Sequence, residues 1–313
     1  MQVITKDLIN GRRVLLRYDI DVVLHPLEDF KLKAGLETLK LCLENASKVI
    51  LMGHLGRPEG KPVESLRVAP IVEWFKSQGF EPEILENLRF DPREESGDLD
   101  YARELAQMGD FYINEAFSSY RPAVSTTVLP TLLPHAAGLH FAQEVEILTR
   151  VRNNPKKPFV AIMGGAKVTD KLPVIEVLAK KADAVLVGGK LVSEIREQNI
   201  ILPKNVMVGK LTEDSFDIAP ETTSSWSGLI SRAAQIVWNG PLGKFEDPKN
   251  DQSAKIAQLV LDSGAESIVG GGDTIALLSQ LDLLDQFSFV SVGGGAMLKF
   301  LADGTLPTIE ALE

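Results

Sequence analysis

The chain has 313 residues, of which 44% are hydrophobic, and this length suits two α/β domains of similar size better than one core. Its 33 basic and 43 acidic residues give a net charge of −10, which argues against a nucleic-acid or anionic-membrane surface. A single cysteine, Cys42, excludes an intrachain disulfide and a Cys/His metal cage, and its apolar helical context predicts a buried structural thiol. Because no apolar run is long enough for a leader or a membrane span, we expect a cytoplasmic protein.

Apolar runs typical of strands alternate along the chain with stretches of helical pattern. The runs lie at residues 14–17, 49–52, 111–113, 159–162, 185–187, 236–238, 267–269 and 287–292. This alternation predicts βα units around parallel sheets. A polar helix over residues 141–152 is followed by Asn153, Asn154 and Pro155, so we expect a linker there and a division of the chain near residue 154.

In the first half, basic residues recur directly after the strands. Arg17 ends the first run, His54 and Arg57 follow the second, and Arg89 and Arg121 lie in two later segments. Parallel sheets place ligands at the carboxyl ends of their strands, so the four arginines predict a site for a small anion. The alternative for each residue taken alone is a surface charge or a partner for a helix dipole.

The segment from residue 157 to 171, KPFVAIMGGAKVTDK, joins a predicted strand to a predicted helix. Gly164 and Gly165 allow a tight turn and leave main-chain amides uncovered, while a following aspartate and Pro173 suit the first helical turn. Lys167 and Lys171 are four residues apart, so on the opening turn they would lie on one face and point at the same bound anion. The alternative is an ordinary turn with two solvated lysines.

Two further glycine runs, at residues 270–272 and 293–295, also follow predicted strands, and residues 237–246 form a fourth strand-end loop. Helix N-termini that face one crevice would supply amides and positive dipole ends for a polyphosphate, and Asp273 could hold its Mg²⁺. The absence of GxxxxGK[ST], GxGxxG, HRD and DFG motifs excludes P-loop, Rossmann-dinucleotide and protein-kinase sites. Close helix-to-strand packing is the alternative reason for each glycine run.

Eight segments occur in the order found in phosphoglycerate kinase, a family that the chain resembles along nearly its whole length. They are RRVLLRYDIDV, LMGHLGRPEGKP, ENLRFDPREE, INEAF, FVAIMGGAKVTDK, IVWNGPLGKFE, IVGGGDT and VSVGGGAMLKFL. The resemblance implies an α/β fold of two Rossmann-like, three-layer domains with parallel sheets, joined by a hinge helix. Residues 1–154 would bind 3-phosphoglycerate, residues 155–304 would bind ADP or ATP with Mg²⁺, and the tail 305–313 would pack back on the first domain.

The same resemblance implies an activity and a role for individual residues. The activity is phosphoryl transfer between 1,3-bisphosphoglycerate and ADP in glycolysis, by a cytoplasmic monomer. The implied catalytic residues are Lys167, Gly293, Gly294 and Lys31. Those implied for the triose acid are Asp19, Asp21, Lys31, His54, Arg57, Arg89 and Arg121. Those implied for the nucleotide are Gly164, Gly165, Lys171, Gly188, Asn239, Glu246, Gly271, Gly272 and Thr274, with Asp273 for the metal.

Several positions depart from the family pattern. Asp21 replaces an asparagine and adds a negative charge beside an anionic substrate, so we expect a base, Lys31 or Arg121, to compensate it. Lys31 itself replaces an arginine and loses the bidentate fork. The family's histidine–arginine pair falls on Arg121 and Pro122, and its preceding aspartate is Glu115.

The chain is also short for the family in two places. Between Glu73 and Glu86 there is hardly room for the usual strand and helix, and between Lys190 and Leu202 a single helix is expected where the family has two. The second loss removes part of the usual adenine pocket, so weaker nucleotide selectivity is expected. These changes motivate an alternative, a catalytically impaired homologue that binds a ligand or partner. The retention of Lys167, Asp273 and the glycine runs together favours the enzyme.

Overall fold

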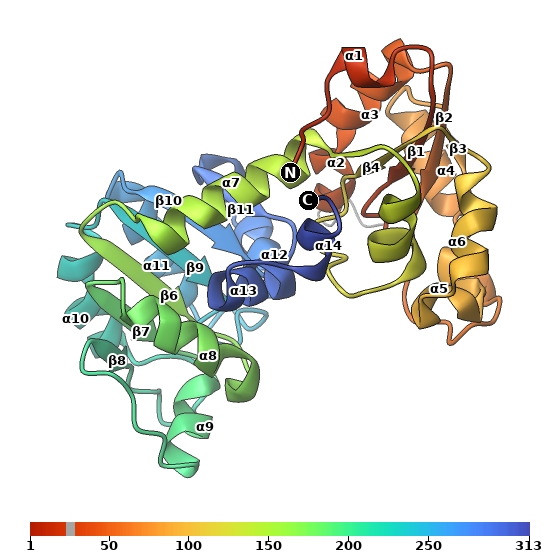
Figure 1. Cartoon of the computed structure of the whole chain (residues 1–313). Coiled ribbons are helices and arrows are strands. Elements are labelled where there is room, and N and C mark those ends of the chain that lie inside the picture. The colour runs from red at the N-terminus through yellow and green to blue at the C-terminus, as the bar shows by residue number, and fades with distance from the viewer. Residues whose placement is uncertain (23–28) are drawn as a thin grey trace. The chain divides into compact units, whose positions relative to one another are not determined.

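The computed structural model describes residues 1–22 and 29–313, which form two compact units. The first unit comprises Met1–Glu146 and Thr305–Glu313, and the second comprises Ile147–Gly304 (Figure 1). The first division therefore falls inside helix α7 (Leu139–Asn153), before the asparagines that follow the predicted linker. Each unit has its own sheet and core.

The first unit contains a five-stranded sheet in the order β3-β2-β1-β4-β5, and all its pairings are parallel. Its strands are β1 (Arg13–Arg17), β2 (Lys48–Met52), β3 (Glu83–Ile84), β4 (Phe111–Asn114) and β5 (His135–Ala137). Its helices include α1 (Lys6–Ile9), α2 (Phe30–Ala34), α3 (Leu36–Asn45), α4 (Ala69–Ser77), α5 (Pro92–Ser96), α6 (Leu99–Ala106) and the C-terminal α14 (Pro307–Glu310).

The core of the first unit explains the apolar runs of its strands. Val14 and Leu16 of β1 are fully buried and belong to one cluster with Leu39 and Cys42 of α3 and Phe75 of α4. Parallel strands covered on both faces lose the alternating polar pattern, which is why these segments read as continuous apolar runs. The thiol of Cys42 is buried as predicted, and burial raises its pKa to about 12.

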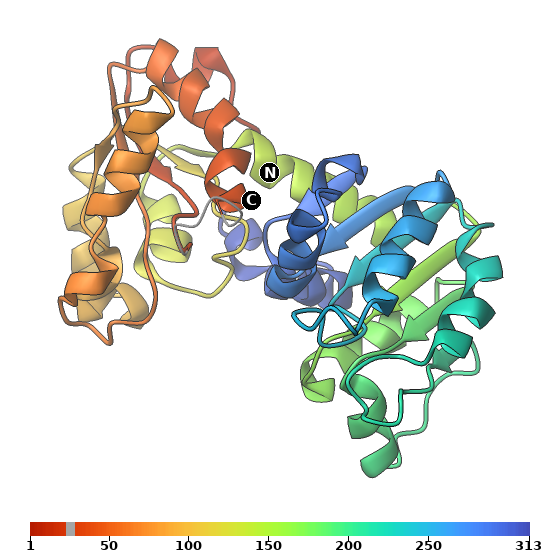
Figure 2. The same ribbon diagram turned by 180° about the vertical axis from the view of Figure 1, so that it is seen from behind.

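The second unit contains a six-stranded parallel sheet in the order β11-β10-β9-β6-β7-β8. Its strands are β6 (Phe159–Met163), β7 (Ala184–Val187), β8 (Val206–Val208), β9 (Gln235–Asn239), β10 (Glu266–Gly270) and β11 (Phe289–Ser291). Its further helices include α8 (Val168–Ala179), α9 (Leu191–Glu197), α10 (Pro220–Ile230), α11 (Gln252–Asp262), α12 (Gly272–Gln280) and α13 (Gly294–Asp303). Figures 1 and 2 show helices on both faces of each sheet.

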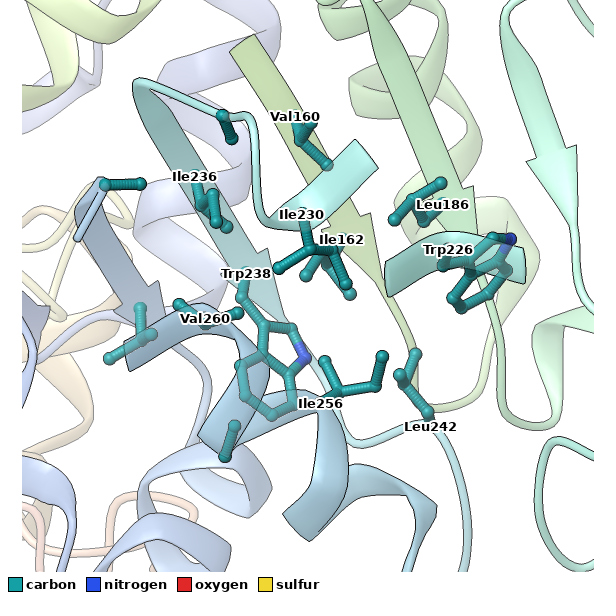
Figure 3. Close-up of a cluster of buried hydrophobic side chains, with 14 of the residues drawn as sticks. Val160, Ile162, Leu186, Trp226, Ile230, Ile236, Trp238, Leu242, Ile256 and Val260 are labelled. Carbon is teal, nitrogen blue, oxygen red and sulfur yellow. The ribbon is translucent and has the colours of Figure 1, made fainter. Parts of the chain in front are cut away.

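One face of the second sheet packs on helices α10 and α11. Figure 3 shows Trp226 and Ile230 from α10, and Ile256 and Val260 from α11, gathered over strand residues that include Trp238. Both tryptophans are almost completely buried. Burying a large apolar side chain contributes about 1.5–3 kcal/mol, so this cluster anchors the strands whose ends carry the candidate site.

The predicted fold class, an α/β protein with two parallel-sheet domains, is confirmed, and each of the eight predicted runs overlaps a strand. The short strands β3, β5 and β8 were not predicted. One helix, α9, lies between Lys190 and Leu202, as expected. The position expected for Pro173 is wrong, because this proline lies in the second turn of α8 and not in the first.

Candidate active site

Both sheets reverse their strand order at one point, and such a switch point is where open α/β sheets bind ligands. In the first unit it lies between β1 and β4, and in the second between β6 and β9. Most of the residues singled out in the sequence follow these four strands or their immediate neighbours. The structure therefore gives each unit one candidate half of an active site.

In the first unit, a cavity of about 330 Å³ lies beyond the ends of the strands. Four arginines from four separate segments line it, namely Arg17, Arg57, Arg89 and Arg121, and His54 and Asp21 line it as well. The predicted convergence of bases is thus what the fold produces. Pro122 also lines the cavity, and the further lining residues that the sequence did not suggest are Glu94, Glu95, Ser118, Ser119, Tyr120, Ala123 and Thr126.

Two of the arginines in this cavity are held by other groups. Arg17 is 1% exposed, and its guanidinium donates to Ser125 Oγ at 3.0 Å and contacts His54 Nδ1 at 2.6 Å. Arg89 donates to the main-chain oxygen of Gly56 at 2.8 Å. In contrast, the exposed guanidinium groups of Arg57 and Arg121 make no ion pair or hydrogen bond within residues 1–22 and 29–313. They remain available to an anion.

His54 is neutral in this setting. Burial lowers its pKa well below the usual value, and the charges of Arg17, Arg89 and Lys31 lower it further. Because Nδ1 accepts from Arg17, the ring proton lies on Nε2, which is 3.7 Å from Asp21 Oδ2. His54 can therefore donate a hydrogen bond into the cavity without adding a charge.

In the described part of the chain, no ion pair joins the Asp21 carboxylate to Lys31 or to Arg121, the two bases expected to compensate it. The main-chain amide of Gly56 donates to Asp21 Oδ1 at 2.8 Å, and His54 Nε2 faces Oδ2. The Lys31 ammonium donates instead to the main-chain oxygen of Asp21 at 3.3 Å and to Ser118 Oγ at 3.5 Å. The Gly56 amide donates to the carboxylate, the neutral imidazole faces it, and the charge of Asp21 interacts with that of Arg89.

Asp19 and Lys31 lie beside the cavity and are not among its lining residues. Asp19 is 3% exposed, and one of its carboxylate oxygens, Oδ2, accepts from the hydroxyl of Ser118. The other oxygen, Oδ1, is buried and has no hydrogen-bond partner in the described part of the chain. A buried carboxylate oxygen left unpaired is costly unless a ligand hydroxyl or water satisfies it.

Glu115, at the family's aspartate position, caps helix α7. Its Oε1 accepts from the amide of His140 at 3.0 Å and from Thr38 Oγ1 at 2.9 Å, and its Oε2 accepts from the amide of Phe141 at 3.1 Å. Burial raises the pKa of this carboxyl to about 7, against the opposing effects of His140 and of these donors. A negative group at a helix N-terminus is favoured by the amides and by the dipole.

In the second unit, Lys171 does not extend from α8 towards solvent. It is 8% exposed, and its ammonium donates to the main-chain oxygen of Gly164 at 2.6 Å and to Asn239 at 2.9 Å (Oδ1) and 3.2 Å (main chain). Burial lowers the pKa of Lys171 to about 8. The lysine therefore ties the end of β6 to the end of β9.

Lys167 differs from Lys171 in backbone conformation, in position relative to α8 and in exposure. It is the N-cap of α8, has φ 67° and ψ 81°, and its side chain is exposed. The prediction that the two lysines share one helical face is therefore wrong, because Lys167 precedes the first helical residue while Lys171 points into the unit. The amides of Lys167 and Val168 donate to the two carboxylate oxygens of Glu194 on α9, a contact with no signal in the sequence.

Several of the candidate glycines are required by close packing of the strand-end loops. A Cβ atom on Gly164 would lie 2.2 Å from the main-chain oxygen of Pro241, and one on Gly294 would lie 2.5 Å from the Cα atom of Gly271. A Cβ atom on Gly188 would meet Leu242 at 2.7 Å. Close packing of the loops is thus a sufficient reason for glycine at these three positions, whereas Gly272 has open space around it and leaves the start of α12 uncovered.

The remaining candidates lie on α12, in the loop after β9 and at the start of α13. Thr274 is buried and its Oγ1 accepts from the amide of Gly240 at 2.7 Å, whereas Asp273, in the first turn of α12, is exposed. Glu246 is exposed in the loop after β9, and Gly293 is the N-cap of α13.

A divalent cation would find one protein carboxylate here. Among the described residues there is no group of three or more histidine, cysteine, aspartate or glutamate side chains that could hold a metal ion. Mg²⁺ often takes one or two carboxylates and completes its octahedron with phosphate oxygens and water. Asp273 fits a Mg²⁺ ion that arrives with a nucleotide, and does not fit a resident metal centre.

Comparison with known proteins decides the family. A family model described as phosphoglycerate kinase matches residues 4–81, 81–201 and 196–304. The chain belongs to the phosphoglycerate kinase family. The junctions between the three matched segments fall at residue 81 and at residues 196–201, inside the two stretches where the sequence is short for the family.

Relatives with the same family name match over almost the full length. The phosphoglycerate kinase of Herpetosiphon aurantiacus is 35% identical over 380 aligned positions, which cover 97% of this chain and 96% of the relative. That of Moorella thermoacetica is 33% identical, with 98% of each chain covered. Because the alignments are longer than the chain, these relatives contain internal segments that have no counterpart here.

Solved structures of phosphoglycerate kinases have the same fold as this chain. Phosphoglycerate kinase from Coxiella burnetii has a TM-score of 0.82 at 29% identity and covers 97% of this chain and 96% of its own. The enzyme from Pyrococcus horikoshii has a TM-score of 0.86 at 23% identity, with 100% and 98% covered, and this likeness concerns the fold alone. In the part of the chain that the structure describes, no helix combines the length and apolarity needed to cross a membrane.

Proposed function

We propose that the chain transfers a phosphoryl group between 1,3-bisphosphoglycerate and MgADP, giving 3-phosphoglycerate and MgATP. The single observation that carries this proposal is the cavity of the first unit, where Arg57 and Arg121 have no partner among the described residues and two further arginines line the wall. Arginine groups recognise phosphate and carboxylate oxygens by charge and by paired hydrogen bonds. A triose acid with both groups fits such a cavity.

In the proposed arrangement, the first unit binds and orients the acid. Arg57, Arg89 and Arg121 offset its negative charges, neutral His54 donates through Nε2, and the unpaired Oδ1 of Asp19 accepts from the substrate hydroxyl. The ammonium of Lys31 lies against the main chain of Asp21 and supplies a positive charge near the carboxylate of the bound acid. The site thus combines charge with two directional groups that select a hydroxy acid.

In the second unit, the proposed nucleotide site is built mainly from backbone. The amides at the starts of α12 and α13 face the phosphates, Thr274 and the turn of Gly164 and Gly165 shape the loop, and Glu246 contacts the ribose. Mg²⁺ enters with the nucleotide and neutralises phosphate charge, and Asp273 supplies its protein ligand. Lys171 does not contact the nucleotide in this arrangement, and its hydrogen bond to Asn239 holds the loop after β9 in place.

The reaction needs no covalent intermediate with the protein. A carboxylate oxygen of 3-phosphoglycerate forms a bond to the terminal phosphorus of ATP while the bond to the ADP oxygen breaks. In this class of reaction catalysis consists of positioning and of offsetting charge, for which we assign Lys167 and the start of α13 at Gly293 and Gly294. The two ligands must meet, so we propose that α7 serves as the hinge between the units.

The test is a coupled assay with 3-phosphoglycerate and MgATP. We expect turnover that depends on both substrates and on Mg²⁺. Tight binding of 3-phosphoglycerate by calorimetry without turnover would contradict catalysis and favour the impaired homologue. In keeping with the family resemblance, we propose that the enzyme acts as a cytoplasmic monomer.

The role of Asp273 has its own test. Asp273→Ala should weaken MgADP binding by about tenfold while leaving metal-free ADP almost unchanged, because the proposed partner of the carboxylate is the cation. Calorimetry with and without Mg²⁺ measures both affinities. Equal weakening of the two would remove the metal role and leave Asp273 as a helix N-terminal residue.

A further inference from the structure

Helix α8 begins with a carboxylate from another helix on its first amides. Glu194 of α9 accepts from the amide of Lys167 at 3.1 Å through Oε1 and from that of Val168 at 2.7 Å through Oε2. No side chain of the N-cap residue itself performs this function. One oxygen therefore serves one amide, and both donors would otherwise lack an acceptor at the helix end.

The conformation of Lys167 makes this contact more than an ordinary cap. Its φ of 67° and ψ of 81° place a non-glycine residue in the left-handed region, a conformation that is unfavourable unless the surroundings hold it there. A residue in this region turns successive amides to one side, where they form a concave anion site. The Glu194 carboxylate fills that site and stabilises the conformation that creates it.

Helix α9 is fixed relative to the same turn by further contacts. The amide of Leu191 donates to the main-chain oxygen of Gly165 at 3.2 Å, and Leu191, Val192 and Ile195 are buried. A Cβ atom on Gly189 would lie 3.0 Å from the amide nitrogen of Gly165, so the two loops are in close contact. Helix α9, which carries Glu194, is therefore packed directly against the turn.

The ammonium of Lys167 is left without a partner by this arrangement. Within residues 1–22 and 29–313 it makes no ion pair or hydrogen bond, and its side chain is exposed. The two oxygens of Glu194 are engaged by main-chain amides, so the carboxylate holds the backbone of Lys167 without neutralising its charge. We propose that Glu194 is a positioning residue that holds Lys167 in the orientation used for phosphoryl transfer.

This inference rests on the proposed function, which assigns Lys167 to the transferred group. If it holds, Glu194→Ala and Glu194→Gln should each lower kcat by about tenfold and change KM for MgATP by less than about threefold. Glutamine should fail as alanine does, because its amide group has one acceptor and would turn an NH₂ donor towards the second amide. Glu197→Gln, on an exposed position of the same helix, is the matched control and should leave both constants unchanged.

Two further measurements separate positioning from general stability. In a Lys167→Ala background, Glu194→Ala should lower kcat by less than about twofold, because its effect passes through Lys167. Hydrogen exchange of the Lys167 and Val168 amides should be faster in Glu194→Ala than in the wild type, while exchange in β6 stays the same. A full tenfold loss in both backgrounds would overturn the proposal.

The opposite outcome is also informative. If the Glu194 carboxylate occupies amides that the nucleotide needs, Glu194→Ala should lower KM for MgATP and raise kcat, and the positioning role would be wrong. Failure of the proposed function is distinguishable from both results. A wild-type chain without turnover would remove the enzymatic role, whereas the exchange rates of the two amides would still show whether Glu194 holds the start of α8.

Discussion

The two units present their candidate residues at the same place, the switch point of a parallel sheet, but they differ in whether these side chains are bonded to neighbouring residues. In the first unit the site is a cavity of side chains, and Arg57 and Arg121 have no partner among the described residues. In the second unit Lys171 and Thr274 are bonded to neighbouring loops. We therefore propose that the first site binds mainly through the free charges of Arg57 and Arg121 and the second mainly through backbone shape. Substitutions of these two arginines should then have local effects, and substitutions of Lys171 or Thr274 should have structural effects.

Both units nevertheless use one device. Glu115 accepts from the first amides of α7, and Glu194 accepts from the amides that open α8, in each case with one carboxylate oxygen per amide. Glu115 is 3% exposed, whereas Glu194 is only partly buried. The burial difference should decide which glutamate makes the protein sensitive to pH.

The largest effect expected from this difference is on stability and involves Glu115. Burial raises its pKa from 4.5 to about 7, so between these values the folded chain retains a proton that the unfolded chain has released. Wild-type stability should therefore fall as pH rises from 4.5 to 7, by an amount on the order of 3 kcal/mol relative to Glu115→Gln, which cannot ionise.

Urea unfolding of both proteins at several pH values measures this difference. Glu194→Gln is the comparison from the second unit. Parallel stability profiles for wild type and Glu115→Gln would mean that the three donors keep Glu115 ionised, and the contrast between the two glutamates would then rest on position alone.

The next largest effect is expected at Lys167, the exposed lysine of the second unit. Lys167→Ala should lower kcat by about a hundredfold or more while the affinity for nucleotide changes little, because the lost charge acts on the transferred group. Stopped-flow turnover and calorimetry with MgADP measure the two quantities. Activity within a few-fold of wild type would show that Lys167 does not act on the phosphoryl group.

Arg57 and Arg89 form a matched pair in the first unit. Arg57→Ala should raise KM for 3-phosphoglycerate by about tenfold and leave thermal stability unchanged, because its guanidinium has no partner in residues 1–22 and 29–313. Arg89→Ala should raise KM and also lower stability, since it removes the bond to Gly56 and the ion pair with Glu95 at 3.2 Å. Loss of stability in both variants would show that Arg57, like Arg89, also contributes to the fold.

The sequence revealed the fold more completely than the bonds within it. Eight strands were predictable because parallel, doubly covered strands are continuously apolar, and even the three-residue β11 lies within the longer predicted run 287–292. In contrast, β3, β5 and β8 have only two or three residues and lie in no such run. Arg17 and Arg57 could be recognised because they lie at or just after a predicted strand, whereas Arg89 and Arg121 were recognised only as bases in two later segments. The contacts of Glu194 with Val168 and of Asp21 with Gly56 join segments 26 and 35 residues apart and depend on loop geometry, so no local pattern predicts them.

The smallest expected effect is at Asp21, whose contact with Gly56 depends on loop geometry. Since the Gly56 amide and His54 Nε2 hold its carboxylate, Asp21→Asn keeps an acceptor for Gly56 and removes a charge that is 43% exposed. Solvent screens a charge in that position, so KM for 3-phosphoglycerate should fall by no more than a few-fold and stay within about tenfold of the wild-type value.

A double-mutant cycle with Arg121→Ala decides between this arrangement and a compensating ion pair. Because no bond joins Asp21 to Arg121 in the structure, the two changes in KM should multiply independently, to within about twofold. A much larger loss from Arg121→Ala in the wild type than in the Asp21→Asn background would show that the two residues act as one unit in solution. A decrease in KM of more than about tenfold from Asp21→Asn alone would show that the Asp21 carboxylate repels 3-phosphoglycerate. The arginines of the first site would then act independently of one another, but Asp21 would not act independently of them.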